Sequence, residues 1–138
     1  MNNKHLPELF VQALNEKRMN LFDQLLDPAY NNHNAYVQPG PEGVKAFFAH
    51  YLDAFPDTRV VMEDVIAEGD RVSARFTYRG TFAKPFLGYL PNQAPVVMRS
   101  IDIWRIKDGK FVEHWDELNL LEVFQQIGAA TMRKAEEQ

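Results

Sequence analysis

The chain has 138 residues, of which 46% are hydrophobic and 12% aromatic, which is enough to build the core of one folded domain. Its 15 basic and 19 acidic residues give a net charge of −4. The basic residues are scattered along the chain, so we expect no nucleic acid partner. Because there is no cysteine, disulfides, thiolate metal sites and cysteine nucleophiles are excluded.

No segment approaches the roughly 20 consecutive apolar residues that a membrane-spanning helix needs. The first ten residues, MNNKHLPELF, also lack the apolar stretch of a secretion signal. We therefore expect a cytoplasmic protein with no membrane partner.

The first part of the chain is predicted to be mostly helical. Apolar residues recur at helical spacing between 6 and 26, which indicates two short helices or one bent helix that ends at Asp27-Pro28. The Asn-, Pro- and Gly-rich segment 29–43 indicates irregular chain around a short strand at 36–38. A strongly amphipathic helix is predicted over 43–55.

After residue 56 the hydrophobic period changes to two. Four runs rich in β-branched and aromatic residues are predicted as strands, at 58–68, 71–82, 95–107 and 110–118. Asp108-Gly109, between the last two runs, is a strong hairpin signal. A last helix is predicted at 118–127, and residues 129–138 are predicted to form a mobile tail.

Helices followed by an antiparallel meander indicate a single α+β domain over residues 1–138, with helices packed on one face of a curved sheet. Such a fold can enclose a pocket, and the 10 Phe, 5 Tyr and 2 Trp supply apolar walls for it. We expect a small hydrophobic molecule as the partner. Composition alone does not distinguish such a pocket from a solid core.

The segment FVEHWDELN, at 111–119, places ionisable side chains where a strand should be apolar. Because alternate residues of a strand share a face, His114 and Asp116 are predicted to lie with Val112 and Leu118 on the buried face. Burial raises the pKa of a carboxylate and a nearby cation lowers it, a balance that can leave Asp116 basic enough to deprotonate an activated carbon. The alternative is a satisfied polar contact, or a pair at a dimer interface.

A second candidate is His33, which lies with Asn32 in the asparagine-rich segment 30–36. Its polar groups could close over the mouth of a cavity, although asparagines also simply satisfy turns. His33, His114 and Asp116 match a set of two histidines and one carboxylate for a metal by residue type. Their spacing is not diagnostic and acid–base groups use the same residue types, so we predict no metal site.

Arg99 is a third candidate, in the predicted strand 95–107. Both faces of this strand carry apolar residues, so the sequence does not assign its buried face; Asp102 lies on the face opposite to that of Arg99. Arg99 could bind a substrate carbonyl or acid, or form an ion pair with a carboxylate. No GxGxxG, GxxxxGK[ST], HExxH or GxSxG motif occurs, so phosphate-binding loops and a serine nucleophile elbow have no support.

The chain resembles the SnoaL-like polyketide cyclases of the NTF2-like group. The resemblance rests on the ordered segments NNHN at 31–34, PGPEGVKAFFAHYLDAFPD at 39–57, EGDRVSARFTYRGTF at 68–82 and FLGYLPNQAPVVMRSIDIWRIKDGKFVEHWDELNLLEVFQQIG at 86–128. It implies a cone in which N-terminal helices pack on a highly curved, mostly antiparallel sheet around a cavity. It also implies a homodimer or higher homo-oligomer formed through the sheets.

The studied cyclases of this family close a ring by intramolecular aldol condensation, without a metal or organic cofactor. The resemblance therefore implies Asp116 as the acid–base, His114 as an orienting or polarising group, and Asn32 and His33 as contacts to substrate oxygens. We expect cofactor-independent aldol or enolisation chemistry on a hydrophobic carbonyl or polyketide-like molecule. The alternatives are a non-catalytic protein that binds small ligands, and an epoxide hydrolase or isomerase of the same fold.

Overall fold

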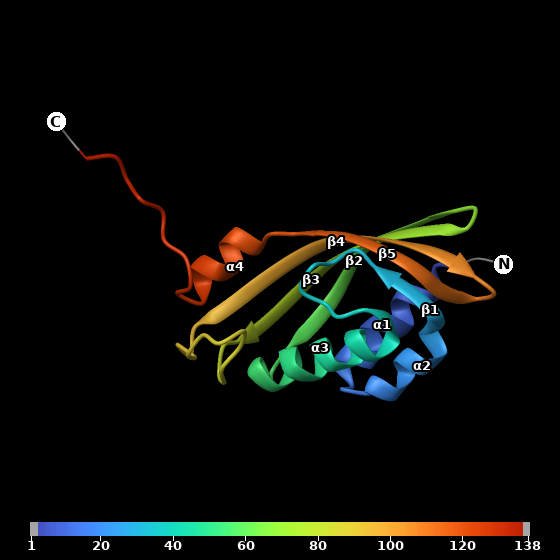
Figure 1. The fold of residues 1–138 in the computed structure, drawn as a ribbon, viewed down its shortest axis with the longest axis horizontal. Coiled ribbons are helices and arrows are strands. Elements are labelled where there is room, and N and C mark those ends of the chain that lie inside the picture. The colour runs from blue at the N-terminus through green and yellow to red at the C-terminus, as the bar shows by residue number, and fades with distance from the viewer. Residues whose placement is uncertain (1–2, 137–138) are drawn as a thin grey trace.

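The computed structural model describes residues 3–136 and has the predicted α+β architecture (Figure 1). The helices pack on one face of a curved sheet, apart from the last one, which lies at one end of it. In chain order the helices are α1 (His5–Asn15), the short 3₁₀ helix η1 (Met19–Leu21), α2 (Phe22–Leu25), α3 (Gly40–Ala54) and α4 (Leu120–Gln126). Within the described residues, none of these helices is long and apolar enough to cross a membrane.

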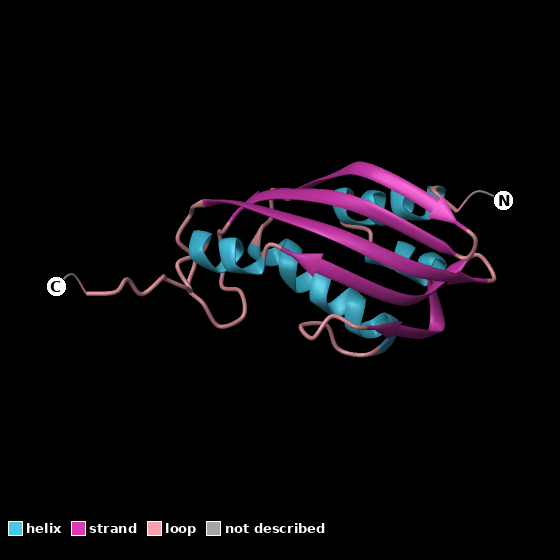
Figure 2. Ribbon diagram, turned by 90° about the horizontal axis from the view of Figure 1, so that it is seen from above, coloured by secondary structure: helices cyan, strands magenta, loops and turns pink. Residues whose placement is uncertain are grey.

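The sheet has five strands and is curved around the helices (Figure 2). The strands are β1 (Leu26–Asn32), β2 (Arg59–Glu68), β3 (Arg71–Thr81), β4 (Pro95–Lys107) and β5 (Lys110–Leu118). Their spatial order is β1-β5-β4-β3-β2. The four strands from β2 to β5 form the predicted antiparallel meander, and β1 pairs in parallel with β5.

The prediction of a strand at 36–38 is wrong, because these residues form a turn and irregular chain. The strand of this region is β1, which begins directly after α2 and includes Pro28. Proline is tolerated there because β1 is an edge strand whose register is irregular between Leu26 and Asn31. β1 carries the chain from the helical layer to the sheet and leaves Asn32 opposite His114.

The start of α3 depends on glycine and proline. Gly40 has a φ of 77°, a left-handed conformation that favours glycine, and Pro41 lies in the first turn, where its missing N–H costs nothing. At Gly43 a Cβ atom would lie 1.8 Å from the backbone oxygen of Gln38. Any larger residue would therefore force the loop away from the helix that it precedes.

The β4–β5 hairpin contains a bulge that decides which side chains meet. Its turn is Asp108-Gly109, with φ values of 51° and 75° that fit a two-residue turn. The pairing begins regularly, but it shifts between Arg105 and Ile106, because Val112 is an extra residue in β5. The shift pairs Asp102 with Asp116, whereas a regular hairpin would pair Asp102 with Trp115.

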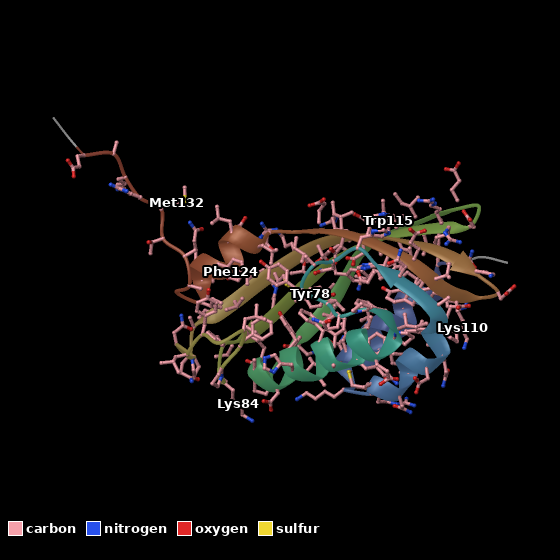
Figure 3. The ribbon with its side chains drawn as sticks, in the orientation of Figure 1. Tyr78, Lys84, Lys110, Trp115, Phe124 and Met132 are labelled. Atoms are coloured by element: carbon pink, nitrogen blue, oxygen red, sulfur yellow. The ribbon has the colours of Figure 1, made fainter. Side chains whose placement is uncertain are left out.

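The core lies between the concave face of the sheet and the helices. Figure 3 places Tyr78 inside this layer, whereas Trp115 lies on the outer side of the sheet. The largest fully buried side chains are mostly aromatic: Phe22, Phe55, Phe76, Phe82 and Phe111. Residues 129–136, within the predicted tail, carry no helix or strand and extend away from the domain (Figure 1). Their mobility stays a prediction, and residues 137–138 lie outside the described part.

Candidate active site

The space between α3 and the sheet contains a cavity that is partly open at one end. The volume of the cavity, counted as the space that the centres of water molecules can reach, is about 70 Å³. This is room for several water molecules. The walls are mainly aromatic and aliphatic, including Phe22, Tyr30, Phe47, Phe48, Tyr51, Tyr78, Phe86, Met98, Trp104 and Phe111. The polar groups that reach it are few, a composition typical of sites for small apolar molecules.

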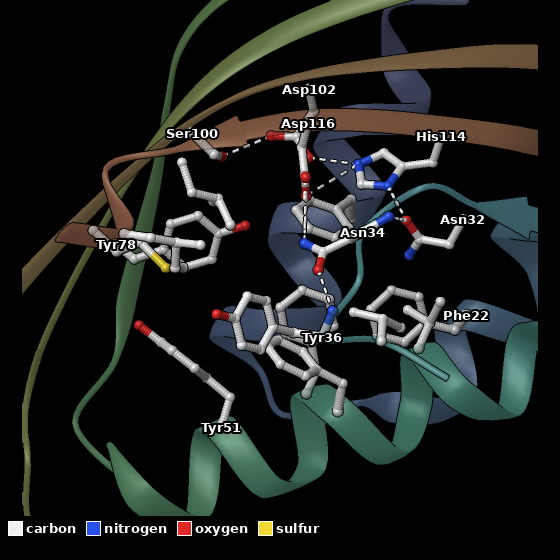
Figure 4. A pocket seen from close by; sticks show the side chains of 18 of the residues that line it. Phe22, Asn32, Asn34, Tyr36, Tyr51, Tyr78, Ser100, Asp102, His114 and Asp116 are labelled. Carbon is white, nitrogen blue, oxygen red and sulfur yellow. Dashed lines mark hydrogen bonds and ion pairs between the residues drawn. The ribbon is translucent and has the colours of Figure 1, made fainter. Parts of the chain in front are cut away.

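Two strands bring a group of ionisable side chains to this cavity. On β4 the buried positions alternate, so that Ser100, Asp102 and Trp104 face inward. On β5 the inward residues are His114 and Asp116. Because the bulge places Asp102 opposite Asp116 and Trp104 opposite His114, these side chains meet on one face (Figure 4).

His114 is held by hydrogen bonds at both ring nitrogens. Its Nδ1 lies 2.8 Å from Oδ1 of Asn32, and its Nε2 lies 2.7 Å from Oδ2 of Asp102. Oδ1 of Asn32 also accepts a hydrogen bond of 2.9 Å from the backbone N–H of Asn34, which fixes that atom as an acceptor. Nδ1 of His114 must therefore carry a proton and donate it to Asn32.

It follows that His114 and Asp102 share a further proton. If Nδ1 is a donor, the 2.7 Å contact between Nε2 and Oδ2 is a hydrogen bond only when a proton lies on one of those two atoms. The pair is thus either imidazolium with carboxylate, or neutral imidazole with carboxylic acid. Both side chains are almost fully buried, with 7% of His114 and 6% of Asp102 exposed, so water does not replace this bond.

Asp116 lies beside this pair and faces the cavity. Its Oδ1 and Oδ2 accept hydrogen bonds of 3.2 Å and 3.0 Å from Nδ2 of Asn34, and its Oδ2 lies 3.8 Å from Nε2 of His114. Burial raises the pKa of Asp116, while the hydrogen bond from Asn34 and the charge of His114 lower it and the negative charge of Asp102 raises it. The net shift is upward, which makes this carboxylate a stronger base than an exposed one.

Two further hydroxyl-bearing side chains extend the polar group along the cavity wall. Ser100 donates a hydrogen bond of 2.6 Å from Oγ to Oδ1 of Asp102. Tyr78 interacts with Ser100 and lines the same cavity. Burial raises the pKa of Tyr78 well above its ordinary value, so its hydroxyl stays protonated and can donate a hydrogen bond.

Asp102, His114 and Asp116 also offer a possible set of metal ligands. One ligand atom from each residue lies within 4.8 Å of the others. The short contact between His114 and Asp102 has the length of a hydrogen bond, and the proton that the pair shares accounts for it. The geometry therefore favours proton transfer over metal binding at this position.

A comparison with known protein families shows the family to which the chain belongs. The sequence pattern of the SnoaL-like polyketide cyclases matches residues 4–127. The chain belongs to the SnoaL-like polyketide cyclase family. No curated protein has a significantly similar sequence.

Several solved structures are similar to this chain over nearly its whole length. TsrD from Streptomyces laurentii is 35% identical with a TM-score of 0.85, over 91% of this chain and 94% of that one. AclR from Streptomyces galilaeus, a hydroxylase candidate, is 26% identical with a TM-score of 0.83, over 94% and 97%. IdmH from Streptomyces antibioticus, a candidate polyketide cyclase, is 25% identical with a TM-score of 0.78, over 93% and 99%. The NTF2-like fold is therefore shown.

The SnoaL-like cavity includes three of the five site residues that the sequence singles out. Asp116, His114 and Asn32 all line it. Phe111 also lines the cavity, because the bulge changes the alternation of β5 at that point. Val112 is buried, as predicted, but is not among the residues that line the cavity.

His33 and Arg99 do not reach the cavity. The ring of His33 stacks on Trp115, 5.1 Å between centroids, and its Nε2 lies 2.9 Å from Glu113. Arg99 forms an ion pair of 2.8 Å with Glu122. Neither side chain is among those that line the cavity, and their contacts with a substrate stay predictions.

Sequence reasoning misses Asp102, Asn34, Ser100 and Tyr78 as parts of the site. Asp102 lies in a strand with apolar residues on both faces, so its burial is not evident from the sequence. Asn34 is one of several asparagines in its segment, and the pattern does not distinguish it from the others. The one available signal is that Ser100 and Asp102 share a strand face with Met98 and Trp104. This signal is informative only when that face is known to point inward.

Proposed function

We propose that this SnoaL-like protein is a cyclase-type enzyme that performs cofactor-independent acid–base chemistry on a hydrophobic carbonyl or polyketide-like molecule. The observation that carries the proposal is the position of Asp116. Its carboxylate faces an apolar cavity, only 12% of the side chain is exposed, and burial raises its pKa. A carboxylate in such a place is suited to remove a proton from carbon.

The first step is enolisation. Asp116 takes a proton from the carbon next to a substrate carbonyl, and the electron pair of that C–H bond forms the enolate. Asn34 holds both carboxylate oxygens of Asp116, and His114 lies beside them. The hydroxyl of Tyr78, kept protonated by burial, supports the charge that develops on the carbonyl oxygen.

The second step forms the ring. The enolate carbon attacks a second carbonyl carbon of the same molecule, and the electron pair of that C=O bond becomes an alkoxide. The proton that Asp116 has taken then passes to this alkoxide, which restores the carboxylate. The cavity walls contribute by folding the chain so that the two carbons approach each other.

His114 and Asp102 act through Asp116 in this scheme. Because Asn32 and Asp102 hold the two nitrogens of His114, the ring cannot turn away from Asp116. The charge of His114 lowers the pKa of Asp116 and the charge of Asp102 raises it, so the pair that shares the proton adjusts the strength of the base. These residues are therefore positioning residues, and Asp116 is the proposed catalytic residue.

The test is the substitution Asp116→Asn, assayed with enolisable ketones and β-keto esters. The amide is nearly isosteric but cannot accept the proton, so we expect hydrogen–deuterium exchange at the α-carbon, followed by NMR, to slow about 10²- to 10⁴-fold. Glu63→Gln is the control, because Glu63 is exposed on β2 and does not line the cavity. Exchange at an unchanged rate in Asp116→Asn would refute the proposed base and favour a non-catalytic ligand-binding protein.

A further inference from the structure

Tyr51 carries a buried hydroxyl for which residues 3–136 supply no hydrogen-bond partner. The residue lies on α3, lines the cavity and is 5% exposed. Among these residues, every fully buried side-chain nitrogen or oxygen has a hydrogen-bond partner. No hydrogen bond joins the Tyr51 hydroxyl to another described residue, so its oxygen must be accessible. Because Tyr51 lines the cavity, we take this oxygen to be reached from the cavity.

The side chains that contact the ring of Tyr51 are aromatic, and none of them is hydrogen-bonded to its hydroxyl. Its ring stacks on Phe55 at 4.8 Å and meets the edges of Tyr78 and Phe86 at 6.1 Å and 5.7 Å. Burial alone raises the pKa of its hydroxyl, since no charge or hydrogen bond from a described residue offsets it. The group is therefore a neutral donor and acceptor in aromatic surroundings, where an unmet hydrogen bond is costly.

Tyr51 lies across the cavity from the ionisable side chains. Figure 4 shows it reaching in from α3, on the side opposite to His114 and Asn32. Tyr78 differs, because it interacts with Ser100 and so belongs to the polar group that includes Asp102. The cavity thus has a polar group around Asp102 and Asp116 and a further polar atom on α3, and its walls are mainly aromatic.

We propose that the Tyr51 hydroxyl is a second polar subsite, which binds an oxygen of the ligand at the end of the cavity away from Asp116. The inference deepens the proposed function, on which it rests, by adding a second contact to the ligand. The ligand carries a carbonyl that reaches Asp116 and, at its other end, a hydroxyl or second carbonyl that reaches Tyr51. The aromatic walls pack on the part between, and Tyr51 fixes the orientation of the bound molecule.

The binding test compares 1-tetralone with its 5-, 6- and 7-hydroxy derivatives, with tryptophan fluorescence as the readout because Trp104 lines the cavity. A hydrogen bond to Tyr51 should make at least one hydroxylated ketone bind the wild-type protein about 3- to 10-fold more tightly than 1-tetralone. In Tyr51→Phe this ratio should fall to about one, while the affinity for 1-tetralone itself stays similar. Tyr36→Phe is the matched control, since Tyr36 also lines the cavity but is 47% exposed.

Two further measurements separate binding by Tyr51 from catalysis by Asp116 and from a role of Tyr51 in folding. Asp116→Asn should keep the wild-type affinity ratio, so a failure of the proposed catalysis leaves this subsite intact. Tyr51→Phe without ligand should melt at the same temperature as the wild type or higher, because no hydrogen bond to a described residue is lost. The inference is overturned if wild type binds the hydroxylated ketones no better than 1-tetralone or binds none of them, if the ratio persists in Tyr51→Phe, or if Tyr51→Phe melts several degrees lower.

Discussion

His114 and Asp102 are joined by one shared proton in the wall of the cavity, with 2.7 Å between Nε2 and Oδ2. The proton is required because Asn32 accepts a hydrogen bond from the other ring nitrogen of His114. This pair sets the charge beside Asp116, and the residue that completes it, Asp102, lies on a different strand from His114.

Asp102→Asn should remove the shared proton. An amide can still donate to Nε2 of His114, so the fold should be kept, but the ring then becomes a neutral acceptor. Because His114 then no longer carries the charge that acts on Asp116, we expect turnover to fall about 10- to 100-fold, or about 1.4–2.7 kcal/mol of transition-state stabilisation. The downfield proton resonance of the pair should disappear from the NMR spectrum. A resonance that persists in Asp102→Asn would contradict the proton assignment.

The activity should depend on pH through Asp116. Only the ionised carboxylate is a base, and burial raises its pKa above the ordinary value of 3.8. We therefore expect kcat/KM to fall as the pH decreases through this raised pKa, with its midpoint above 3.8. A pH profile of the α-proton exchange rate measures this midpoint. A midpoint at or below the ordinary value would show that Asp116 is not the group that titrates.

The raised pKa of Asp116 also predicts how the stability of the protein depends on pH. Because the folded-state pKa of Asp116 is raised, the native protein binds this proton more tightly than the unfolded chain does. Stability is therefore lost as the pH rises from the unfolded value of about 3.8 through the folded pKa. Asp116→Asn lacks this loss. The difference between its free energy of unfolding and that of the wild type should therefore increase with pH and then level off, and urea unfolding at several pH values measures it. A pH-independent difference would argue against a raised pKa.

Asn34→Ala should move the acid limb of the pH profile to higher pH. The hydrogen bonds from Nδ2 of Asn34 favour the ionised form of Asp116, so their loss raises the pKa of that carboxylate. Asn31→Ala is the control, because Asn31 is exposed on the neighbouring strand β1. If both variants give the wild-type profile, Asn34 does not tune the base.

His33→Ala and Arg99→Ala should leave α-proton exchange within about twofold of the wild-type rate, since neither side chain lines the cavity. Their ion-pair partners, Glu113 and Glu122, are on or near the surface, where such pairs stabilise little. Kinetics and thermal melting test both points. A large rise in KM for either variant would restore the substrate contact predicted from the sequence.

We expect the protein to form a homodimer through the outer face of the sheet. Ile66, Ser73, Ile103 and Trp115 form a row across four strands there, and Ile66 and Ile103 are 67% and 39% exposed. Apolar side chains on an open sheet face are typical of an interface between copies. Sedimentation at micromolar concentration should show a dimer for the wild type and a monomer for Ile103→Glu. A wild-type monomer would dispose of this prediction.

Much of the fold follows from local patterns in the chain. The period-two runs predict β4 and β5 at the same bounds that the structure shows, and Asp108-Gly109 predicts their turn. The helix α3 is found from its apolar spacing, three residues late at its start. The strand β1 is missed, because Pro28 and several asparagines hide an edge strand whose pairing partner is far away in the sequence.

The site was predictable only in part, for a physical reason that lies in one residue. Alternation within β5 was enough to place His114 and Asp116 on a common face, since this is a property of a single strand. Which residues of β4 face them depends on the register between strands, and the bulge at Val112 changes that register by one residue. The register set by this bulge, which no single strand reveals, therefore decided that Asp102, and not Arg99, meets the proposed base.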